Sequence, residues 1–311
     1  MTARATAGVG RGRWRGEPTI RLHAGDTTAA FAPGLGLTGV SLRRGGAEFL
    51  ATPGGPAALR GGHTLGLPLL APWANRLAPT DGGYRAAGVR VAVPARGGGL
   101  HRDGNGLPIH GLLVGADGWA IGTERSGAGR ASFTATRDLD AAVFPFPHRI
   151  GVTVTLTDGA LRVTTTVTPT GRRSVPVAFG WHPYLRVPGS PRGRWRLVLP
   201  AREHLVLDRR GLPTGARSRE AAERAPIGRR TFDDLSDVRR SRVLALETDT
   251  ASVTLRSDPG YPFAQVWVPP GRPFAALEPM VAPTNALVTG GVPVVAPGDA
   301  FSATFTLRLE I

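Results

Sequence analysis

Apolar and polar positions alternate with a period of two in short runs along most of the chain. Over residues 150–156 every second residue is apolar, and the same alternation resumes over residues 161–167. Asp158 and Gly159 separate the two runs, and glycine supplies the positive φ that a two-residue hairpin turn requires. The pattern predicts a β-hairpin joined by an Asp-Gly turn.

Other segments repeat this short form, bounded by turn residues. They are RWRLVLP (194–200), RVLALET (242–248), SVTLRS (252–257), FAQVWVP (263–269) and SATFTLRLEI (302–311). Helical periodicity is almost absent, and REAAERA (219–225) is the best candidate for a helix. The 43 glycines and 28 prolines favour many short strands joined by turns. We therefore expect an all-β fold, a large antiparallel β-sandwich.

The length of 311 residues fits one large sandwich, and no internal repeat or linker divides the chain. Residues 18–311 are therefore expected to form a single domain. Residues 1–17 are polar and rich in arginine, without the apolar centre of a secretory signal, and we expect a disordered basic tail. No apolar run approaches the roughly 18 residues of a membrane span, so we expect a cytoplasmic protein without a membrane partner.

The formal net charge of +15 raises the question of an anionic partner. All 38 basic residues are arginines, and they are scattered along the chain. We therefore expect a solvated basic surface and no nucleic-acid partner, with binding of nucleic acid through the basic tail as the alternative. The absence of lysine excludes Schiff-base chemistry, and the absence of cysteine excludes disulfides, thiolate metal sites and a cysteine nucleophile.

The stretch FGWHPYLRVPG (179–189) interrupts the strand pattern with rings, a histidine and prolines. Pro183 restricts the backbone of His182 to the extended region, while Trp181 and Tyr184 place an aromatic ring near it. A histidine held in this way at the end of a strand can donate or accept a proton near neutral pH. A core histidine bonded to a backbone carbonyl would fit the same sequence.

Two further stretches break the strand pattern. PLLAPWANRL (68–77) ends an apolar run and displays Asn75 and Arg76, which also fits a strand end with a solvated arginine. LPIHGLLVGADGW (107–119) places His110 before Gly111, where the missing Cβ lets a backbone or a ligand come close. That histidine could equally be a loop residue without a partner.

Two acidic residues are candidates for chemistry. Glu278 in FAALEPMVAPTNAL (274–287) follows apolar positions and has no arginine beside it in sequence. It is either the structural partner of a buried group or a base whose pKa is raised by burial. Asp233 in TFDDLSD lies between strands and also fits a turn or cap residue. No spacing matches a zinc site, a phosphate loop, a dinucleotide fingerprint or a serine hydrolase elbow.

In this order, the stretches resemble the motifs of the aldose 1-epimerase (galactose mutarotase) family. PWANRL resembles that family's PW-x-NR motif, HGLLVGADGW its HG motif, FGWHPYL its GWHPYF motif and LEPMVAPTNAL its EPM-x-x-PP-NAF motif. The shorter pieces LPTG, FDD and FAQVWVP fall where the family has comparable segments. The resemblance extends from about residue 25 to the C-terminus, and several ordered motifs are more specific than any one alone.

The resemblance implies a β-supersandwich with an open sugar cleft, a small-molecule sugar as substrate and no cofactor or metal. It implies that His182 is the general acid and Glu278 the general base of anomer exchange. With ordinary pKa values, Glu278 would set the acidic limb of the pH profile and His182 the basic limb. The residues expected to contact the sugar are Arg76, His110, Asp233, Gln265, Asn75 and Trp181.

The chain departs from the family motifs around the sugar. It reads HGLLVG where the family often has HGFAR, it has Leu185 in place of a phenylalanine, and PTNAL lacks the second proline and the final phenylalanine. The expected acid and base are retained, so an aldose 1-epimerase is the first hypothesis. A hexose-6-phosphate mutarotase and a non-catalytic sugar-binding protein of the same fold are the alternatives. The sequence leaves open the sugar and whether the protein is a monomer or a homodimer.

Overall fold

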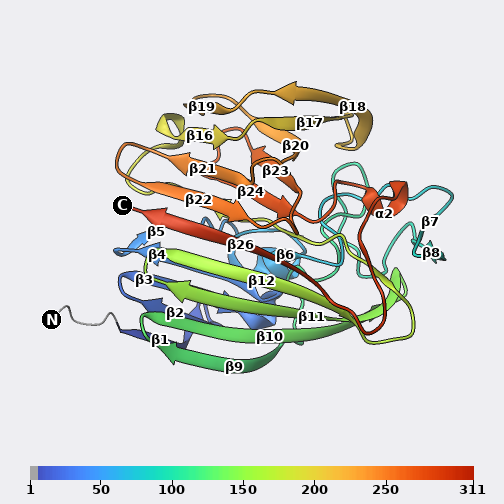
Figure 1. Cartoon of the computed structure of the whole chain (residues 1–311), viewed down its shortest axis with the longest axis horizontal. Coiled ribbons are helices and arrows are strands. Elements are labelled where there is room, and N and C mark those ends of the chain that lie inside the picture. Colours follow the sequence, from blue (N-terminus) through green and yellow to red (C-terminus); the bar gives the residue numbers. More distant parts are fainter. Residues whose placement is uncertain (1–5) are drawn as a thin grey trace.

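Strands dominate the computed structural model, which describes residues 6–311 (Figure 1). The largest sheet has nine strands, in the order β19 (Glu223–Pro226), β16 (Arg196–Leu199), β21 (Val243–Glu247), β22 (Ser252–Ser257), β26 (Phe301–Glu310), β12 (Ala160–Pro169), β11 (Phe144–Thr157), β10 (Arg130–Ala141) and β9 (Ala120–Gly127). All its neighbouring strands run antiparallel.

Two further sheets make up the second layer. A five-stranded sheet has the order β1 (Ala7–Trp14), β2 (Glu17–Ala24), β3 (Thr27–Ala32), β4 (Thr38–Arg44) and β5 (Ala47–Glu48). An eight-stranded sheet has the order β18 (Pro213–Glu220), β17 (Arg202–Leu207), β20 (Phe232–Asp237), β23 (Phe263–Val268), β24 (Ala275–Met280), β14 (Gly180–Trp181) and β6 (Leu69–Leu70), with β15 (Tyr184–Leu185) also paired to β24.

The remaining elements are short. Two small sheets pair β13 (Val175–Pro176) with β25 (Val294–Val295) and β7 (Gly83–Ala86) with β8 (Val89–Ala92). The helices of the described chain are α1 (Gly55–Arg60), α2 (Ala286–Thr289) and the 3₁₀ turns η1 (Pro33–Leu35) and η2 (Arg192–Arg194). In Figure 1, α2, β7 and β8 lie with long loops at one end of the sandwich. None of the described helices is long and apolar enough to span a bilayer.

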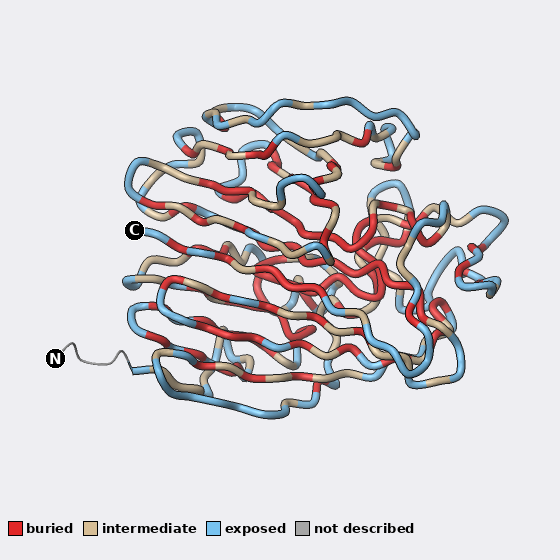
Figure 2. The backbone as a smooth tube through the Cα atoms, in the orientation of Figure 1, coloured by how far each residue is buried: buried red, intermediate tan, exposed pale blue. Residues whose placement is uncertain are grey.

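The core lies between the layers, where apolar side chains of facing strands meet. Phe31 of β3 packs edge-on against Phe133 of β10 at 5.6 Å, and Trp181 of β14 packs against Phe305 of β26 at 5.8 Å. One cluster of buried apolar residues runs from Ile20 to Leu309 and draws on all three large sheets. Figure 2 shows these buried positions concentrated inside the sandwich. This continuity supports the proposal that residues 18–311 form one domain.

The all-β sandwich and the predicted hairpin are confirmed. The ladder between β11 and β12 runs from His148↔Pro169 to Thr157↔Ala160, which leaves Asp158 and Gly159 as the two-residue turn. Gly159 has φ of 72°, as a turn of this kind requires. The five other strand segments expected from the sequence also form strands, namely β16, β21, β22, β23 and β26.

The best candidate for a helix, residues 219–225, is not helical. This segment contains the end of β18 and the start of β19. Glu220 pairs with Arg202 of β17, and Glu223 pairs with Leu199 of β16. The helical propensity of its alanine and glutamate residues is weak compared with two ladders of backbone hydrogen bonds, so tertiary context decides the structure.

The expectation of a disordered tail over residues 1–17 is wrong for the residues that the structure describes. β1 pairs with β2 along its whole length, from Ala7↔Ala24 to Trp14↔Glu17. Val9 packs against the main core, and Arg11 donates to Glu124 of β9 at 2.5 Å. Glycine and arginine are poor strand formers, but pairing at a sheet edge and these two contacts stabilise the strand. Residues 1–5 lie outside the described residues.

Candidate active site

His182 and Glu278 meet in the eight-stranded sheet. His182 directly follows β14, and its backbone N–H donates to the carbonyl of Pro68 at 3.1 Å. Glu278 lies within β24, opposite Gln265 of β23. The imidazole Nε2 of His182 is 3.2 Å from Oε1 of Glu278, and their side chains are only 6% and 2% exposed. The structure therefore places the expected acid and base in direct contact and nearly out of water.

Burial shifts the pKa values of the pair in opposite directions. Desolvation lowers the pKa of His182 to about 3. Desolvation raises the pKa of Glu278 well above its usual range; the charge of Asp233 raises it further, and that of Arg76 opposes the shift. Both shifts favour the uncharged form of each group. Burial of the pair therefore favours a neutral imidazole beside a protonated carboxyl group.

Aromatic rings hold the imidazole of His182. The ring of Tyr184 stacks on it at 4.7 Å with an interplanar angle of 19°, and Trp267 meets it edge-on at 5.6 Å. The Tyr184 hydroxyl is 2.7 Å from the Thr64 hydroxyl, and its other side packs on Phe274 at 4.9 Å. Sequence analysis missed Trp267, although its spacing of two from Gln265 places both on one face of β23.

His110 forms a third wall of the pair. Its ring meets His182 edge-on at 5.4 Å, and desolvation lowers its pKa well below the usual range. His110 has φ of 63°, and Gly111 follows at 70°. A Cβ on Gly111 would lie 2.2 Å from the Ala71 carbonyl oxygen, which accepts a bond from Leu112 N–H at 2.7 Å. Any residue with a Cβ at position 111 would collide with the backbone at Ala71, so only glycine lets the two segments pack this closely.

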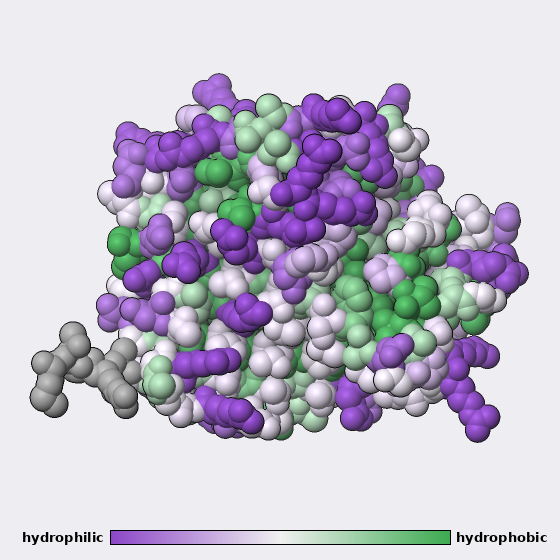
Figure 3. Space-filling view, in the orientation of Figure 1, coloured by the Kyte–Doolittle hydropathy of each residue, from purple (hydrophilic) through white to green (hydrophobic). Residues whose placement is uncertain are grey.

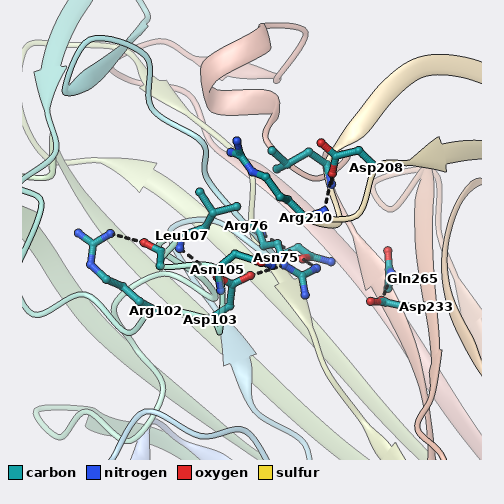
Figure 4. Close-up of polar contacts among 12 residues, drawn as sticks. Asn75, Arg76, Arg102, Asp103, Asn105, Leu107, Asp208, Arg210, Asp233 and Gln265 are labelled. Atoms are coloured by element: carbon teal, nitrogen blue, oxygen red, sulfur yellow. Dashed lines mark hydrogen bonds and ion pairs between the residues drawn. The ribbon is translucent and has the colours of Figure 1, made fainter.

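Arg76 is oriented by an ion pair that sequence analysis did not find. Its Nε donates to Oδ2 of Asp103 at 2.7 Å, and its NH1 donates to Oδ1 of Asn75 at 3.2 Å (Figure 4). Asp103 is itself fixed, because its Oδ1 accepts bonds from the backbone amides of Asn105 and Leu107, each at 2.9 Å. Burial opposes these bonds, but the bonds from Arg76 and the two amides lower the pKa of Asp103.

Gln265 and Asp233 form the other polar side of the site. Nε2 of Gln265 donates to Oδ1 of Asp233 at 2.6 Å, and Figure 4 shows this pair on adjacent strands apart from the Arg76 group. Among the described residues, four buried atoms around the site have no hydrogen-bond partner: Gln265 Oε1, Glu278 Oε2, His110 Nδ1 and His182 Nδ1. Buried polar atoms are normally paired, so these atoms are suited to a polar ligand.

A cavity of about 320 Å³ opens beside this group, and its lining includes Arg76, Asp233, Asp234, Asp208, Arg209 and Arg210. Gly211 covers Arg76 so closely that a Cβ there would lie 2.5 Å from the guanidinium. Arg76 and Asp233 thus face the cavity, whereas His182 and Glu278 have little exposed surface and do not line it. Residues 208–211 and the side chain of Arg76 form part of the wall of this cavity.

Trp181 does not belong to this group, which corrects the expectation that it contacts the sugar. Its side chain is fully buried, its Nε1 donates to Oγ1 of Thr165 at 3.0 Å, and it packs on Phe305 in the core. Successive side chains of an extended segment point to opposite faces, so Trp181 points into the sandwich where His182 points out of it. The other expected residues lie within the site.

The fold is galactose mutarotase-like. A galactose mutarotase-like protein from Clostridium acetobutylicum superposes with a TM-score of 0.86 at 19% identity, covering 98% of this chain and 99% of that one. One from Lactobacillus casei gives 0.73 at 20% identity, covering 94% and 100%. Galactose 1-epimerase from Lactobacillus acidophilus gives 0.77 at 12% identity, covering 98% of each chain.

The family follows from the sequence itself. Residues 18–308 match the aldose 1-epimerase family, and the chain belongs to that family. No curated protein sequence matches the chain. β1 precedes the matched residues, whereas all the site residues described above lie within them.

Proposed function

We propose that the protein is an aldose 1-epimerase that interconverts the α and β anomers of a hexose. The observation that carries this proposal is the contact between His182 and Glu278, two titratable groups held 3.2 Å apart by separate strands. Arg76, Asn75, His110, Asp233 and Gln265 would hold the sugar hydroxyls around them. Family membership supports the reaction class, and His182 and Glu278 would be its acid and base.

In the proposed reaction, one group takes the proton of the C1 hydroxyl while the other protonates the ring oxygen. The bond between C1 and the ring oxygen breaks, and the aldehyde forms at C1. Rotation about C1–C2 and closure on the other face reverse both proton transfers. Each positioned proton transfer contributes about 10² to 10⁴ in rate, and the cycle returns both protons.

The resting pair needs one internal step to act in the expected roles. Glu278 as base and His182 as acid require a carboxylate and an imidazolium, whereas burial favours the neutral forms. Transfer of one proton across the 3.2 Å contact converts one form into the other without changing the total number of protons. The proposed active state is therefore the pair with one proton, whichever group carries it.

This account predicts a bell-shaped pH profile of kcat/KM with reversed limbs. As the pH falls, a second proton enters the pair on His182, so the acidic limb should lie near its pKa of about 3. As the pH rises, the pair loses its last proton, so the basic limb should follow the raised pKa of Glu278. Initial rates from pH 3 upward, corrected for buffer catalysis, test this. An acidic limb near the ordinary carboxyl value of about 4.3 with a basic limb near 6.5 would contradict it.

A second prediction concerns the ion pair that orients Arg76. Asp103→Ala should raise KM by about tenfold or more with a smaller change in kcat, because a charge-assisted hydrogen bond contributes about 1.5 to 3 kcal/mol. Asp103→Asn keeps an acceptor for the backbone amides, so its KM should lie between that of Asp103→Ala and that of the wild type. Asp138→Asn breaks an exposed pair with Arg149 and serves as the control. Equal kinetics in all three variants would remove the positioning role of Asp103.

The charge of the cavity bears on the phosphorylated alternative. Its arginines, Arg76, Arg209 and Arg210, are matched by Asp208, Asp233 and Asp234, so the surplus of basic residues is not concentrated there. Arg76 is also paired with Asp103. This balance favours an uncharged hexose over a hexose 6-phosphate. Anomer-exchange NMR on glucose, galactose and their 6-phosphates separates the two, and exchange of the 6-phosphates alone would establish the alternative.

A non-catalytic sugar-binding protein would bind through the hydroxyl-contacting residues without needing the pair. The same NMR experiment distinguishes this case, since such a protein would broaden or shift sugar signals without transferring magnetisation between anomers. Catalysed exchange would exclude it.

A further inference from the structure

A larger cavity lies on the outer face of the five-stranded sheet and shares no lining residue with the cavity beside Arg76 and Asp233. Side chains of β1–β3 that point inward pack on β9–β11, and α1 covers part of the outer face through a separate apolar cluster that includes Leu35, Val40 and Leu59. The rest of that face forms the floor of a groove of about 960 Å³. Its opposite wall is made of residues 50–53, Arg186 and residues 272–274. We call this the β1–β4 groove.

The β1–β4 groove gathers positive charge. Six arginines line it: Arg11, Arg15, Arg21, Arg43, Arg186 and Arg272. Arg11 is paired with Glu124 and Arg43 with Glu48. In the part of the chain that the structure describes, no carboxylate pairs with Arg15, Arg21, Arg186 or Arg272. These four come from separate segments and converge on one cavity.

The one carboxylate among the described lining residues is already saturated. Glu48 accepts bonds from Ser41 Oγ at 2.6 Å, Arg43 Nε at 3.0 Å, and the backbone amides of Leu42 and Leu50 at 2.8 and 3.1 Å. These bonds fix Glu48 in the wall of the groove. Its ion pair is with Arg43, so it does not pair with Arg15, Arg21, Arg186 or Arg272. A concave surface with charge of one sign concentrates its field and attracts ligands of the opposite sign.

The shape of β1 contributes to the groove. Gly10 of β1 lines it, and a Cβ at Gly8 or Gly12, two residues to either side, would lie 2.4 Å from the His23 ring or 2.3 Å from the Arg21 side chain. The side chains of His23 and Arg21 therefore lie flat across β1 instead of projecting from the floor. The alternating glycines of GVGRG, which match no nucleotide fingerprint, have a structural reason here.

We propose that the β1–β4 groove is a second ligand site that binds a small molecule carrying two or more phosphate groups. Guanidinium groups pair with phosphate through two parallel hydrogen bonds, and the four unpaired arginines can engage more than one phosphate. The volume lies in the range of small-molecule sites, about 300 to 1,000 Å³. The site is separate from the proposed sugar cleft, whose arginines and aspartates are balanced.

The test uses inorganic tripolyphosphate as the probe in isothermal titration calorimetry at constant ionic strength. The wild type should bind it saturably with a stoichiometry of one. Arg186→Gln combined with Arg272→Gln should weaken the affinity by about tenfold or more, since each loses a charge-assisted bond. The control pair Arg229→Gln with Arg256→Gln removes the same charge from exposed arginines outside the groove and should change Kd by less than about twofold. Circular dichroism verifies folding of both pairs.

Three outcomes would overturn the proposal: no saturable binding, equal loss in both pairs, or binding only of a single-stranded oligonucleotide with an affinity unaffected by the Arg186 and Arg272 changes. The first would show a groove without a phosphate site, and the second would show attraction by net charge alone. The third would place an extended polyanion elsewhere on the basic surface. Anomer exchange is measured on the same proteins, so failure of the groove and failure of the proposed enzyme remain separable.

Discussion

Glu278→Gln should lower kcat for anomer exchange by ~10² to 10⁴, because glutamine keeps the size of the side chain but cannot exchange a proton. The substitution should leave the fold intact. Glu278 is 2% exposed and its carboxyl is held away from water, so an amide in the same space carries no added desolvation cost. Polarimetry on the purified variant, with the buffer-catalysed rate subtracted, measures the effect.

The matched control for this variant is Glu124→Gln, which removes a carboxylate from the exposed ion pair with Arg11. Its kcat should equal that of the wild type. A folded Glu278→Gln protein with near wild-type exchange would show that Glu278 is a structural partner of His182 and not a proton carrier.

His182→Asn should produce a loss of similar size, ~10² to 10⁴ in kcat, since asparagine retains a polar group but does not titrate. The double variant with Glu278→Gln should lose less than the product of the two single losses, because the groups share one proton and act as a unit. His148→Asn, a change at a buried histidine of β11 outside the site, controls for loss of a buried ring. Losses that multiply in full would indicate two independent groups.

The alternation of apolar and polar residues predicted most of the strands, because this period of two fits a strand that buries one face of its sheet. The hairpin of β11 and β12 is an example, with its turn fixed by Asp158 and Gly159. The pattern failed where long-range pairing decides the structure. β1 is a strand because β2 pairs with it and Glu124 binds Arg11, and neither partner is visible within residues 7–14.

The site was predicted only in part, because it too depends on pairing between segments that are distant in the sequence. The motifs identified His182 and Glu278 individually, but their 3.2 Å contact depends on the pairing of β14 and β15 with β24. The motifs also suggested Trp181, which extended geometry directs into the core, and passed over Trp267, which packs on the His182 ring. Asp103 could not be predicted, since a loop residue becomes a partner of Arg76 only when two distant segments meet.

The sequence suggested a pKa of Glu278 raised by burial as one of two interpretations, but it did not suggest the lowered pKa of His182. Residue types alone suggest a carboxylate with a low pKa and an imidazole with a higher one. Burial lowers the pKa of His182 and raises that of Glu278, which reverses their usual order. The rings of Tyr184, Trp267 and His110 pack around the imidazole of His182. Both directions favour the state in which the pair shares one proton.

The most direct test of the central claim is the rate of anomer exchange from pure α anomers of unphosphorylated aldoses, glucose and galactose first. Wild-type protein should accelerate the approach to equilibrium in proportion to its concentration, above the rate of the buffer, and Glu278→Gln at the same concentration should not. Equal rates for wild-type protein, Glu278→Gln and buffer, across every aldose of the panel, would contradict the account.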